Sequence, residues 1–282
     1  MSGPAPIPAD AHLMIIGAMK CGTSSLYDYL LAHPAIAPCR VKEPEFFSRH
    51  QAHGVRPRPR RYAELWAFDP ARHRYALEAS TGYTKYPYEP DVPERIREAG
   101  LNPRLIYLVR DPIERIESHH RFIAGSTTQR LPAADYTAGM LDACRYASQL
   151  ERYTRCFPRE RLLVLDMALL RQRPALPLRE RLAAFLGLDP APWPAQVPVL
   201  HDTDRLPAWD GWLRRLPGWG FCERRLPRPV AALRGALARR WPAPRLRLSE
   251  AQRREIREAL QGEMRQLARD HGIDVRAWGF SA

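Results

Sequence analysis

The sequence predicts an α/β fold in which a central parallel sheet is flanked by helices. Short apolar stretches bounded by charged or turn residues are typical of buried central strands in such sheets. Helical patterns separate these stretches, and strands that alternate with helices indicate a sheet with helices on both faces. The four predicted strands are Leu13–Ile16, Tyr75–Leu77 leading to Glu78, Leu105–Val109 and Leu162–Leu165.

Four segments are predicted to be helical. The first is the amphipathic stretch Thr23–Leu31, and the second begins after Asp111 with Pro112 at its first position, where proline is favoured. The third covers about Ala138–Phe157. The fourth is Ser249–His271, in which Ser249 can cap the helix. Its apolar residues recur at helical spacing at Ile256, Leu260, Met264 and Leu267.

The length of 282 residues suits one domain with short appendages. We expect a flexible arm over residues 1–11, a single domain over residues 12–282 and a C-terminal helix over residues 249–271. Residues 197–248 are rich in Pro and Arg and are expected to be irregular. Prolines crowd Pro174–Pro198 and Pro217–Pro244, which argues against long helices there, and Val55–Arg61 is expected to be a surface loop.

The cysteine content and the distribution of apolar residues indicate the cellular compartment of the chain. Five scattered cysteines without a C-x-x-C pair are typical of a reducing compartment and argue against a disulfide framework or a zinc site. The first residues lack the pattern of a signal peptide, and no stretch is long enough to span a membrane. We therefore expect a cytoplasmic protein with no stable membrane insertion.

The net charge of +13 attracts anions such as nucleotides, nucleic acids, acidic glycans or lipid headgroups. A GC-rich coding bias is the other explanation, because Ala, Pro and Arg abound while Lys is scarce.

The segment His12–Leu31 (HLMIIGAMKCGTSSLYDYLL) joins an apolar strand, a glycine loop and a helix. Backbone N–H groups and the positive end of a helix dipole bind anions in such a loop. A nucleotide triphosphatase P-loop reads G-x-x-x-x-G-K-[ST]. Here Lys20 precedes the second glycine, Gly22, and Thr23 stands in the place of the Walker lysine. The pattern predicts a P-loop-like fold that binds a phosphate-like group with a differently placed cation.

A second segment places Arg110 at the end of the predicted strand Leu105–Val109, with Ser118 eight residues later in the next helix. Arginine can bind a phosphate through two donors, and a nearby hydroxyl can complete the site. The alternative is that Arg110 pairs with Asp111 and that Ser118 is solvated.

A third segment, Val41–Ser48 (VKEPEFFS), has a Lys–Glu pair before two phenylalanines. Alone it indicates a loop with Phe46 and Phe47 in the core.

Together these three segments resemble the sulfotransferase superfamily, especially its heparan-sulfate-type branch and bacterial relatives. The loop Gly17–Leu26 (GAMKCGTSSL) is similar to the family's 5′-phosphosulfate loop, and Arg110 with Ser118 in VRDPIERIES matches its 3′-phosphate motif. Glu43 matches the glutamate that the family uses as general base.

The segment Glu78–Tyr83 (EASTGY) is similar to the family's E-K-[ST]-P-x-Y, but it departs at Ala79, where many heparan-type members have lysine. The resemblance covers roughly residues 12–190.

The resemblance implies 3′-phosphoadenosine 5′-phosphosulfate as donor, adenosine 3′,5′-bisphosphate as product and no metal. It implies that Lys20 neutralises the departing oxygen and that Glu43 takes a proton from a hydroxyl or amine of a small-molecule or glycan acceptor. It implies donor binding by Lys20, Cys21, Gly22, Thr23, Ser24, Arg110 and Ser118. The family's late Lys-Gly-rich loop has no clear counterpart here, and the candidates to replace it are Arg224, Arg225, Arg239 and Arg240.

Two other classes of protein stay open. One is an ATP-dependent P-loop kinase, in which Asp111 or Asp166 would act as the Walker-B carboxylate. The other is a non-enzymatic protein that binds polyanions, although no nucleic-acid-binding motif is present and we expect no nucleic-acid partner. Further candidates are Lys42 as an anion ligand and His119 or His120 as an alternative base. The sequence leaves the oligomeric state open.

Overall fold

The structure is a computed structural model that describes residues 7–49, 62–126, 136–198, 227–240 and 248–282, together with Trp219 and Arg225. The chain divides into two compact units. The first unit comprises Met1–Asp111, Asp142–Leu200 and Leu260–Ala282, and the second comprises Pro112–Leu141 and His201–Ala259. Residues 1–6 of the predicted arm (residues 1–11) and the predicted loop Val55–Arg61 lie outside the described residues, while Ala9–Ala11 of the arm form a short 3-10 turn (η1).

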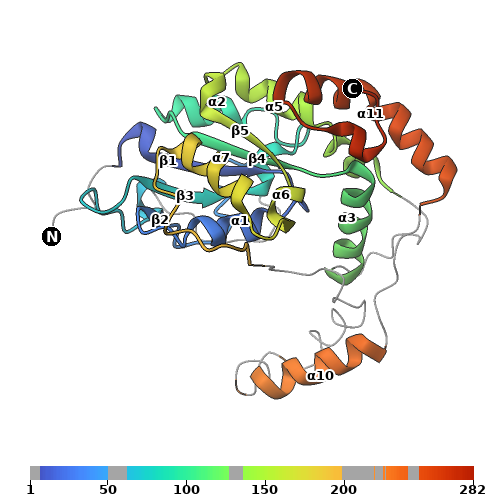
Figure 1. Cartoon of the computed structure of the whole chain (residues 1–282), viewed down its shortest axis with the longest axis horizontal. Helices are drawn as coiled ribbons and strands as arrows, with labels where there is room; N and C mark the ends of the chain where they lie inside the picture. Colours follow the sequence, from blue (N-terminus) through green and yellow to red (C-terminus); the bar gives the residue numbers. More distant parts are fainter. Residues whose placement is uncertain are drawn as a thin grey trace. The chain divides into compact units, whose positions relative to one another are not determined.

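The first unit is built on a five-stranded parallel sheet in the order β2-β3-β1-β4-β5 (Figure 1). The prediction of a central parallel sheet is confirmed, and all four predicted strands are present. The short edge strand β2 was missed because it offers only two apolar residues before a proline. The strands are β1 (His12–Gly17), β2 (Ile36–Pro38), β3 (Tyr75–Ala79), β4 (Arg104–Val109) and β5 (Leu162–Asp166).

The central strand β1 is buried along its whole length, between β3 on one side and β4 on the other. Burial on both faces explains why this strand is a continuous apolar run rather than an alternating one. The chain leaves β1 toward β2 and β3 but continues from β3 across β1 to β4. The carboxyl end of β1 therefore lies at the point where the strand order reverses, which is where ligands bind in open parallel sheets.

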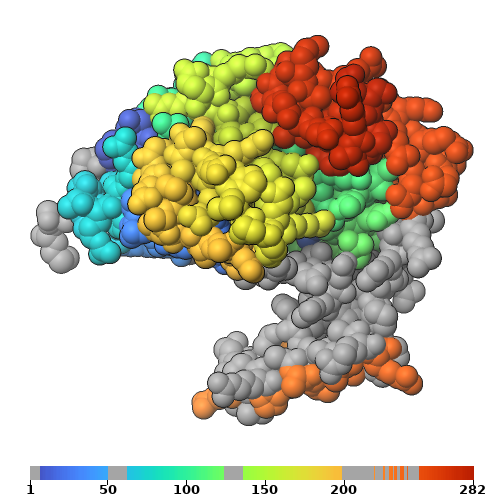
Figure 2. Space-filling model, viewed as in Figure 1, coloured from blue at the N-terminus to red at the C-terminus, as the bar shows by residue number. Residues whose placement is uncertain are grey.

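Helices cover both faces of this sheet. Figure 1 shows α1 and α7 together over one face, with α2 and α5 on the opposite side. In Figure 2 the yellow atoms of α7 and its neighbours hide the sheet from the viewer. The helices are α1 (Thr23–Leu30), α2 (Val92–Glu98), α5 (Tyr146–Thr154), α6 (Ala168–Arg171) and α7 (Leu176–Leu186). The 3-10 turns η2 (Tyr62–Leu65), η3 (Thr81–Thr84), η4 (Arg159–Arg161) and η6 (Val275–Trp278) belong to the same unit.

The predicted helix over Ala138–Phe157 is wrong as a single element. It consists of α4 (Ala138–Asp142) and α5, because Arg145 has ψ 65° and leaves the helical region. The N–H of Tyr146 donates to the carbonyl of Cys144 at 2.9 Å, which turns the chain between the two helices. Apolar periodicity does not register such a break.

The argument from proline against helices was also wrong in two places. Helix α7 and the fourteen-residue helix α10 (Pro227–Arg240) lie in the two proline-rich stretches. Pro177 stands in the first turn of α7, and Pro227 and Pro229 begin α10. In a first turn the missing N–H is not needed and the fixed φ suits the helix.

In the second unit, helix α3 (Pro112–Ser126) begins at Pro112 as predicted. Arg253 donates to Glu117 at 2.8 Å within this unit.

Helix α11 (Glu250–His271) runs through both units, and Ser249 accepts from the N–H of Gln252 at 3.2 Å, which confirms the predicted cap. The four apolar residues predicted to form its buried face, from Ile256 to Leu267, are all inaccessible to solvent. Within the described ranges, no helix is both long enough and apolar enough to cross a bilayer.

Candidate functional site

The glycine loop, residues 17–22, joins β1 to α1 at the carboxyl edge of the sheet. The N–H of Ala18 donates to the carbonyl of Leu108 in β4 at 2.9 Å, which holds the loop over the neighbouring strand. Lys20 and Gly22 have φ values of 70° and 88°, so the backbone turns sharply before α1 begins at Thr23. A short turn ahead of a helix N-terminus is the geometry in which backbone N–H groups bind anions.

Gly17 is required by close packing. A Cβ at this position would lie 2.1 Å from Oγ1 of Thr84 and 2.9 Å from the ring of Tyr107. Thr84 donates its hydroxyl hydrogen to the carbonyl of Ile16 at 2.8 Å, so its side chain packs against the end of β1. The glycine thus lets the strand end pass close to η3.

The structure brings together Lys20 and Arg110, which come from two of the predicted binding segments. The guanidinium of Arg110, at the end of β4, donates to the carbonyl of Lys20 at 3.4 Å. The hydroxyl of Tyr146 in α5 donates to the carbonyl of Arg110 at 2.8 Å and lies 3.9 Å from the thiol of Cys21. Tyr146 was missed because a tyrosine in a helix 36 residues downstream carries no local signal of this role.

Three further loop residues differ in accessibility. The thiol of Cys21 is fully buried and its N–H donates to the carbonyl of Ala18 at 3.1 Å, so this residue shapes the loop from within. Ser24 is partly exposed in the first turn of α1, whereas Thr23 is buried. The N-terminal turn of α1 therefore presents Ser24 more openly than Thr23.

Glu43 lies in an acidic loop, residues 43–49, which follows β2. The hydroxyl of Thr81 donates to a carboxylate oxygen of Glu43 at 3.3 Å, and Glu43 is only partly buried. Both Glu43 and Glu45 have a φ of 49°, in the left-handed region that non-glycine residues rarely adopt. Glu43 is therefore accessible while its backbone is held in an unusual conformation.

Glu45 has a different role from Glu43, since it is only 6% exposed. Its carboxylate accepts from the N–H of Gly82 at 2.8 Å and from the hydroxyl of Ser48 at 2.6 Å. Burial is the main cause that raises its pKa. A Cβ on Gly82 would lie 2.1 Å from this carboxylate, which explains the glycine.

A second buried carboxylate, Glu78, is the last residue but one of β3. Its side chain is 0% exposed and accepts from the hydroxyls of Tyr62, Ser80 and Tyr83. Burial raises the pKa of Glu78 to about 7, against the smaller lowering effect of these three hydrogen bonds. The role of Glu78 was not predicted, because a glutamate after an apolar strand does not reveal how deeply it is buried.

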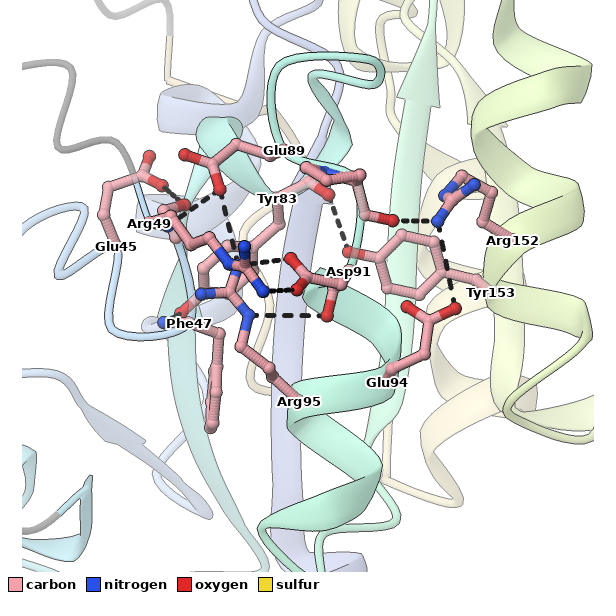
Figure 3. Close-up of polar contacts among 12 residues, drawn as sticks. Glu45, Phe47, Arg49, Tyr83, Glu89, Asp91, Glu94, Arg95, Arg152 and Tyr153 are labelled. Carbon is pink, nitrogen blue, oxygen red and sulfur yellow. Dashed lines mark hydrogen bonds and ion pairs between the residues drawn. The ribbon is translucent and has the colours of Figure 1, made fainter.

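Charged groups tie the far end of the acidic loop to Glu89 and Asp91, just before α2. Figure 3 shows Arg49 among Glu89, Asp91 and Arg95. The N–H of Arg49 donates to Glu89 at 2.8 Å, and its guanidinium pairs with Asp91. Arg95 contacts Glu89 at 3.4 Å and Asp91 at 3.2 Å. The loop that carries Glu43 is thus anchored at both ends.

The other candidates are placed as follows. Ser118 is buried in α3, in the second unit, so its pairing with Arg110 stays a prediction. Asp166 accepts from the N–H of Ala168 at 2.8 Å and so shapes the turn into α6. Lys42 is exposed and His120 is buried.

Arg224 lies outside the described residues, whereas Arg225 and Arg240 are exposed and nothing is described of the side chain of Arg239. Across the described ranges, no cluster of three or more His, Cys, Asp or Glu side chains could hold a metal ion.

A parallel sheet with a glycine loop at the end of its central strand defines the chain as an α/β protein with a central parallel sheet flanked by helices. Residues 10–198 match the family model described as the sulfotransferase domain. The chain therefore belongs to the sulfotransferase family.

The relatives are distant. The chain is 29% identical over 188 residues to human heparan sulfate glucosamine 3-O-sulfotransferase 3B1, covering 62% of this chain and 45% of that protein. It is 31% identical over 111 residues to the membrane-associated sulfotransferase kil1 of Dictyostelium discoideum, covering 39% of this chain and 22% of that protein. The chain thus spans less than half the length of these relatives.

A solved sulfotransferase from Alicyclobacillus acidocaldarius superposes with a TM-score of 0.65 at 21% identity, covering 97% of this chain and 100% of that one. This likeness supports the fold.

Proposed function

We propose that this protein transfers the sulfuryl group of 3′-phosphoadenosine 5′-phosphosulfate to a hydroxyl or amine acceptor. The observation that carries the proposal is the contact between Arg110 and the carbonyl of Lys20. It joins the two segments that the resemblance assigns to the two phosphates of the donor. Membership of the sulfotransferase family supports the same chemistry.

The donor would bind at the reversal point of the sheet. The turn at Gly22 and the N-terminus of α1 suit a 5′-phosphate, to which Ser24 can add a hydroxyl. Arg110, with Ser118 from the second unit, would bind the 3′-phosphate. The N–H groups in the first turn of a helix have no partner within the helix, so the start of α1 can offer donors to a phosphate-like group.

The chemistry needs charge neutralisation at one oxygen and proton removal at another. In an in-line transfer the bond from sulfur to the bridging oxygen of the donor breaks while a bond from sulfur to the acceptor forms. Lys20 would neutralise the oxygen that leaves with the nucleotide, and Glu43 would take the acceptor's proton. Glu43 suits this role better than Glu45 or Glu78, because only Glu43 of the three is partly exposed.

The acceptor is proposed to be a small molecule or a glycan. The name of the human relative describes action on heparan sulfate glucosamine, and the net charge of +13 favours an anionic partner. Position 79 is alanine here, whereas many heparan-type members have lysine there. This difference argues for an acceptor that is positioned differently from the heparan-type one. We further propose a cytoplasmic location, consistent with the free thiols Cys39 and Cys156, and a single domain over residues 12–282.

Calorimetry tests the donor assignment. The full chain should bind adenosine 3′,5′-bisphosphate without a metal ion, and Arg110→Ala should weaken binding by about 10- to 100-fold, the value of a charge-assisted hydrogen bond. A preference for ATP with Mg²⁺ would instead support the kinase alternative. A mass-shift screen with the donor and pooled small molecules and oligosaccharides then searches for the acceptor. Failure to bind the bisphosphate at all would overturn the proposal.

A further inference from the structure

We propose that Glu78 is a positioning residue that holds the acidic loop, and with it Glu43, through the hydroxyl groups of Ser80 and Tyr83. The inference rests on the proposed function, because it concerns the loop that carries the proposed base. Glu78 itself is fully buried and takes no part in the transfer step.

Two hydroxyl groups stand between Glu78 and the backbone of the loop. The hydroxyl of Ser80 donates to Glu78 at 2.9 Å and accepts from the N–H of Glu45 at 3.1 Å. The hydroxyl of Tyr83 donates to Glu78 at 3.2 Å and accepts from the N–H of Phe47 at 3.3 Å. One buried carboxylate is therefore linked to two N–H groups of the loop.

The charge of Glu78 sets the direction of both links. A hydroxyl has one hydrogen to donate, and its lone pairs face the other way. Above about pH 7, where the carboxyl group of Glu78 is ionised, it only accepts, so it draws the hydrogens of Ser80 and Tyr83 toward itself and leaves their lone pairs for the loop. A glutamine at this position would present an N–H₂ group in place of one acceptor oxygen, so at least one of the hydroxyls of Tyr62, Ser80 and Tyr83 would lose its acceptor.

The same strand-end segment reaches the loop at four consecutive residues. Between the contacts of Ser80 and Tyr83, Thr81 donates to Glu43 at 3.3 Å and the N–H of Gly82 donates to Glu45 at 2.8 Å. A displacement of residues 80–83 would therefore also displace Glu43.

The loop needs such support because two of its residues, Glu43 and Glu45, have left-handed backbones. Backbone conformations of this kind persist only where the surrounding structure enforces them.

Tyr62 supplies a matched control. Its hydroxyl also donates to Glu78, from a side chain that packs on the rings of Phe46 and Phe47. The hydroxyl of Tyr62 makes no hydrogen bond to the backbone of the loop among the described contacts. Tyr62→Phe therefore removes a hydrogen bond from the same carboxylate and leaves the two links intact.

Hydrogen exchange of the full chain tests the proposal without an acceptor. In Glu78→Gln, Ser80→Ala and Tyr83→Phe, the amides of Glu43 and of residues 45–48 should exchange about tenfold faster, while Tyr62→Phe should resemble the parent protein. The amides of the glycine loop serve as an internal reference. Unchanged exchange at residues 43–48 in all three variants, or equal acceleration in Tyr62→Phe, would overturn the proposal. Ser80→Ala and Tyr83→Phe keep the test decisive if Glu78→Gln does not fold.

Kinetics with the acceptor found by the screen give a second readout. Glu78→Gln should lower kcat by about 10- to 100-fold through misplacement of the base, with KM for the donor and affinity for adenosine 3′,5′-bisphosphate unchanged. If the parent protein is active and Glu78→Gln has the same kcat, the positioning role of Glu78 is rejected and the proposed function stands. An inactive parent protein that does not bind the bisphosphate would reject the proposed function, whereas the exchange experiment would still report on the loop.

Discussion

Replacing Glu78 by Gln should change how the free energy of unfolding varies with pH. Burial raises the pKa of Glu78 from 4.5 to about 7 in the folded protein. Between these values the folded state binds a proton that the unfolded state releases, so the stability contributed by this group is full below pH 4.5 and is lost as the pH rises through 7. The gap corresponds to about 3 kcal/mol at most.

His12 opposes this trend in the same pH range. Burial lowers the pKa of His12 from 6.5 to about 4, so the unfolded state binds the proton in this case. The stability contributed by neutral His12 is present above pH 6.5 and is lost as the pH falls through 4, and it is also worth about 3 kcal/mol. In the parent protein the two groups should nearly cancel between pH 4.5 and 6.5.

Most of the titratable groups that face Glu78 do not change their protonation between pH 4.5 and 8. Tyr62 and Tyr83 have pKa values well above 10, because they are buried, and burial raises the pKa values of Tyr27 and Cys39 to about 12. Glu45 is the exception, since burial also raises its pKa. Because Glu45 is retained in the variant, subtracting the two profiles removes most of its contribution.

Urea unfolding at several pH values between 4.5 and 8 measures the effect. The free energy of unfolding of Glu78→Gln minus that of the parent protein should be about 3 kcal/mol larger at pH 8 than at pH 4.5. This is expected because the variant lacks the buried charge that the parent acquires at high pH. Tyr62→Phe should show a much smaller pH dependence of the difference, because it keeps the carboxyl group. A difference between Glu78→Gln and the parent that does not vary with pH would refute the reasoning.

The remaining predictions concern the site. Lys20→Ala should reduce turnover by about 10²- to 10³-fold with an unchanged melting temperature, measured by donor consumption, and near-normal turnover would contradict its role. Glu43→Gln should lower kcat by about 10²- to 10⁴-fold while calorimetric affinity for the bisphosphate stays the same; an unaltered rate would assign the base elsewhere. Gly17→Ala should destabilise the protein by about 2–4 kcal/mol in urea unfolding, because its Cβ would lie 2.1 Å from Thr84. Gly100→Ala, also at positive φ but with no atom within 4 Å, should cost less, and equal losses would rule out the clash.

The sheet could be predicted from the sequence because its central strands are buried on both faces. Continuous apolar runs mark such strands, and the start of α3 was marked by Pro112. The break at Arg145 and the helix α10 could not be predicted from the same signals. Periodicity does not record a single non-helical residue, and proline excludes a helix only beyond its first turn.

The candidate site was predictable only where a local motif carries it. The glycine loop, Arg110 and Glu43 each lie in a recognisable run of residues. The contacts of Tyr146 with Arg110, and of Glu78 with Tyr62, join residues far apart in the chain, or depend on depth of burial. Neither property leaves a pattern in the neighbouring sequence, so these supporting residues emerge only from the fold.

The two ends of the acidic loop differ in their sensitivity to dissolved ions. At the outer end, Arg49 is 60% and Asp91 28% exposed, so water and dissolved ions weaken their attraction. At the inner end, the hydrogen bonds to Glu78 are shielded from solvent. Concentrated salt would therefore weaken the pair of Arg49 with Asp91, while the N–H of Arg49 kept its hydrogen bond to Glu89, which is only 3% exposed, and Glu43 stayed in contact with Thr81.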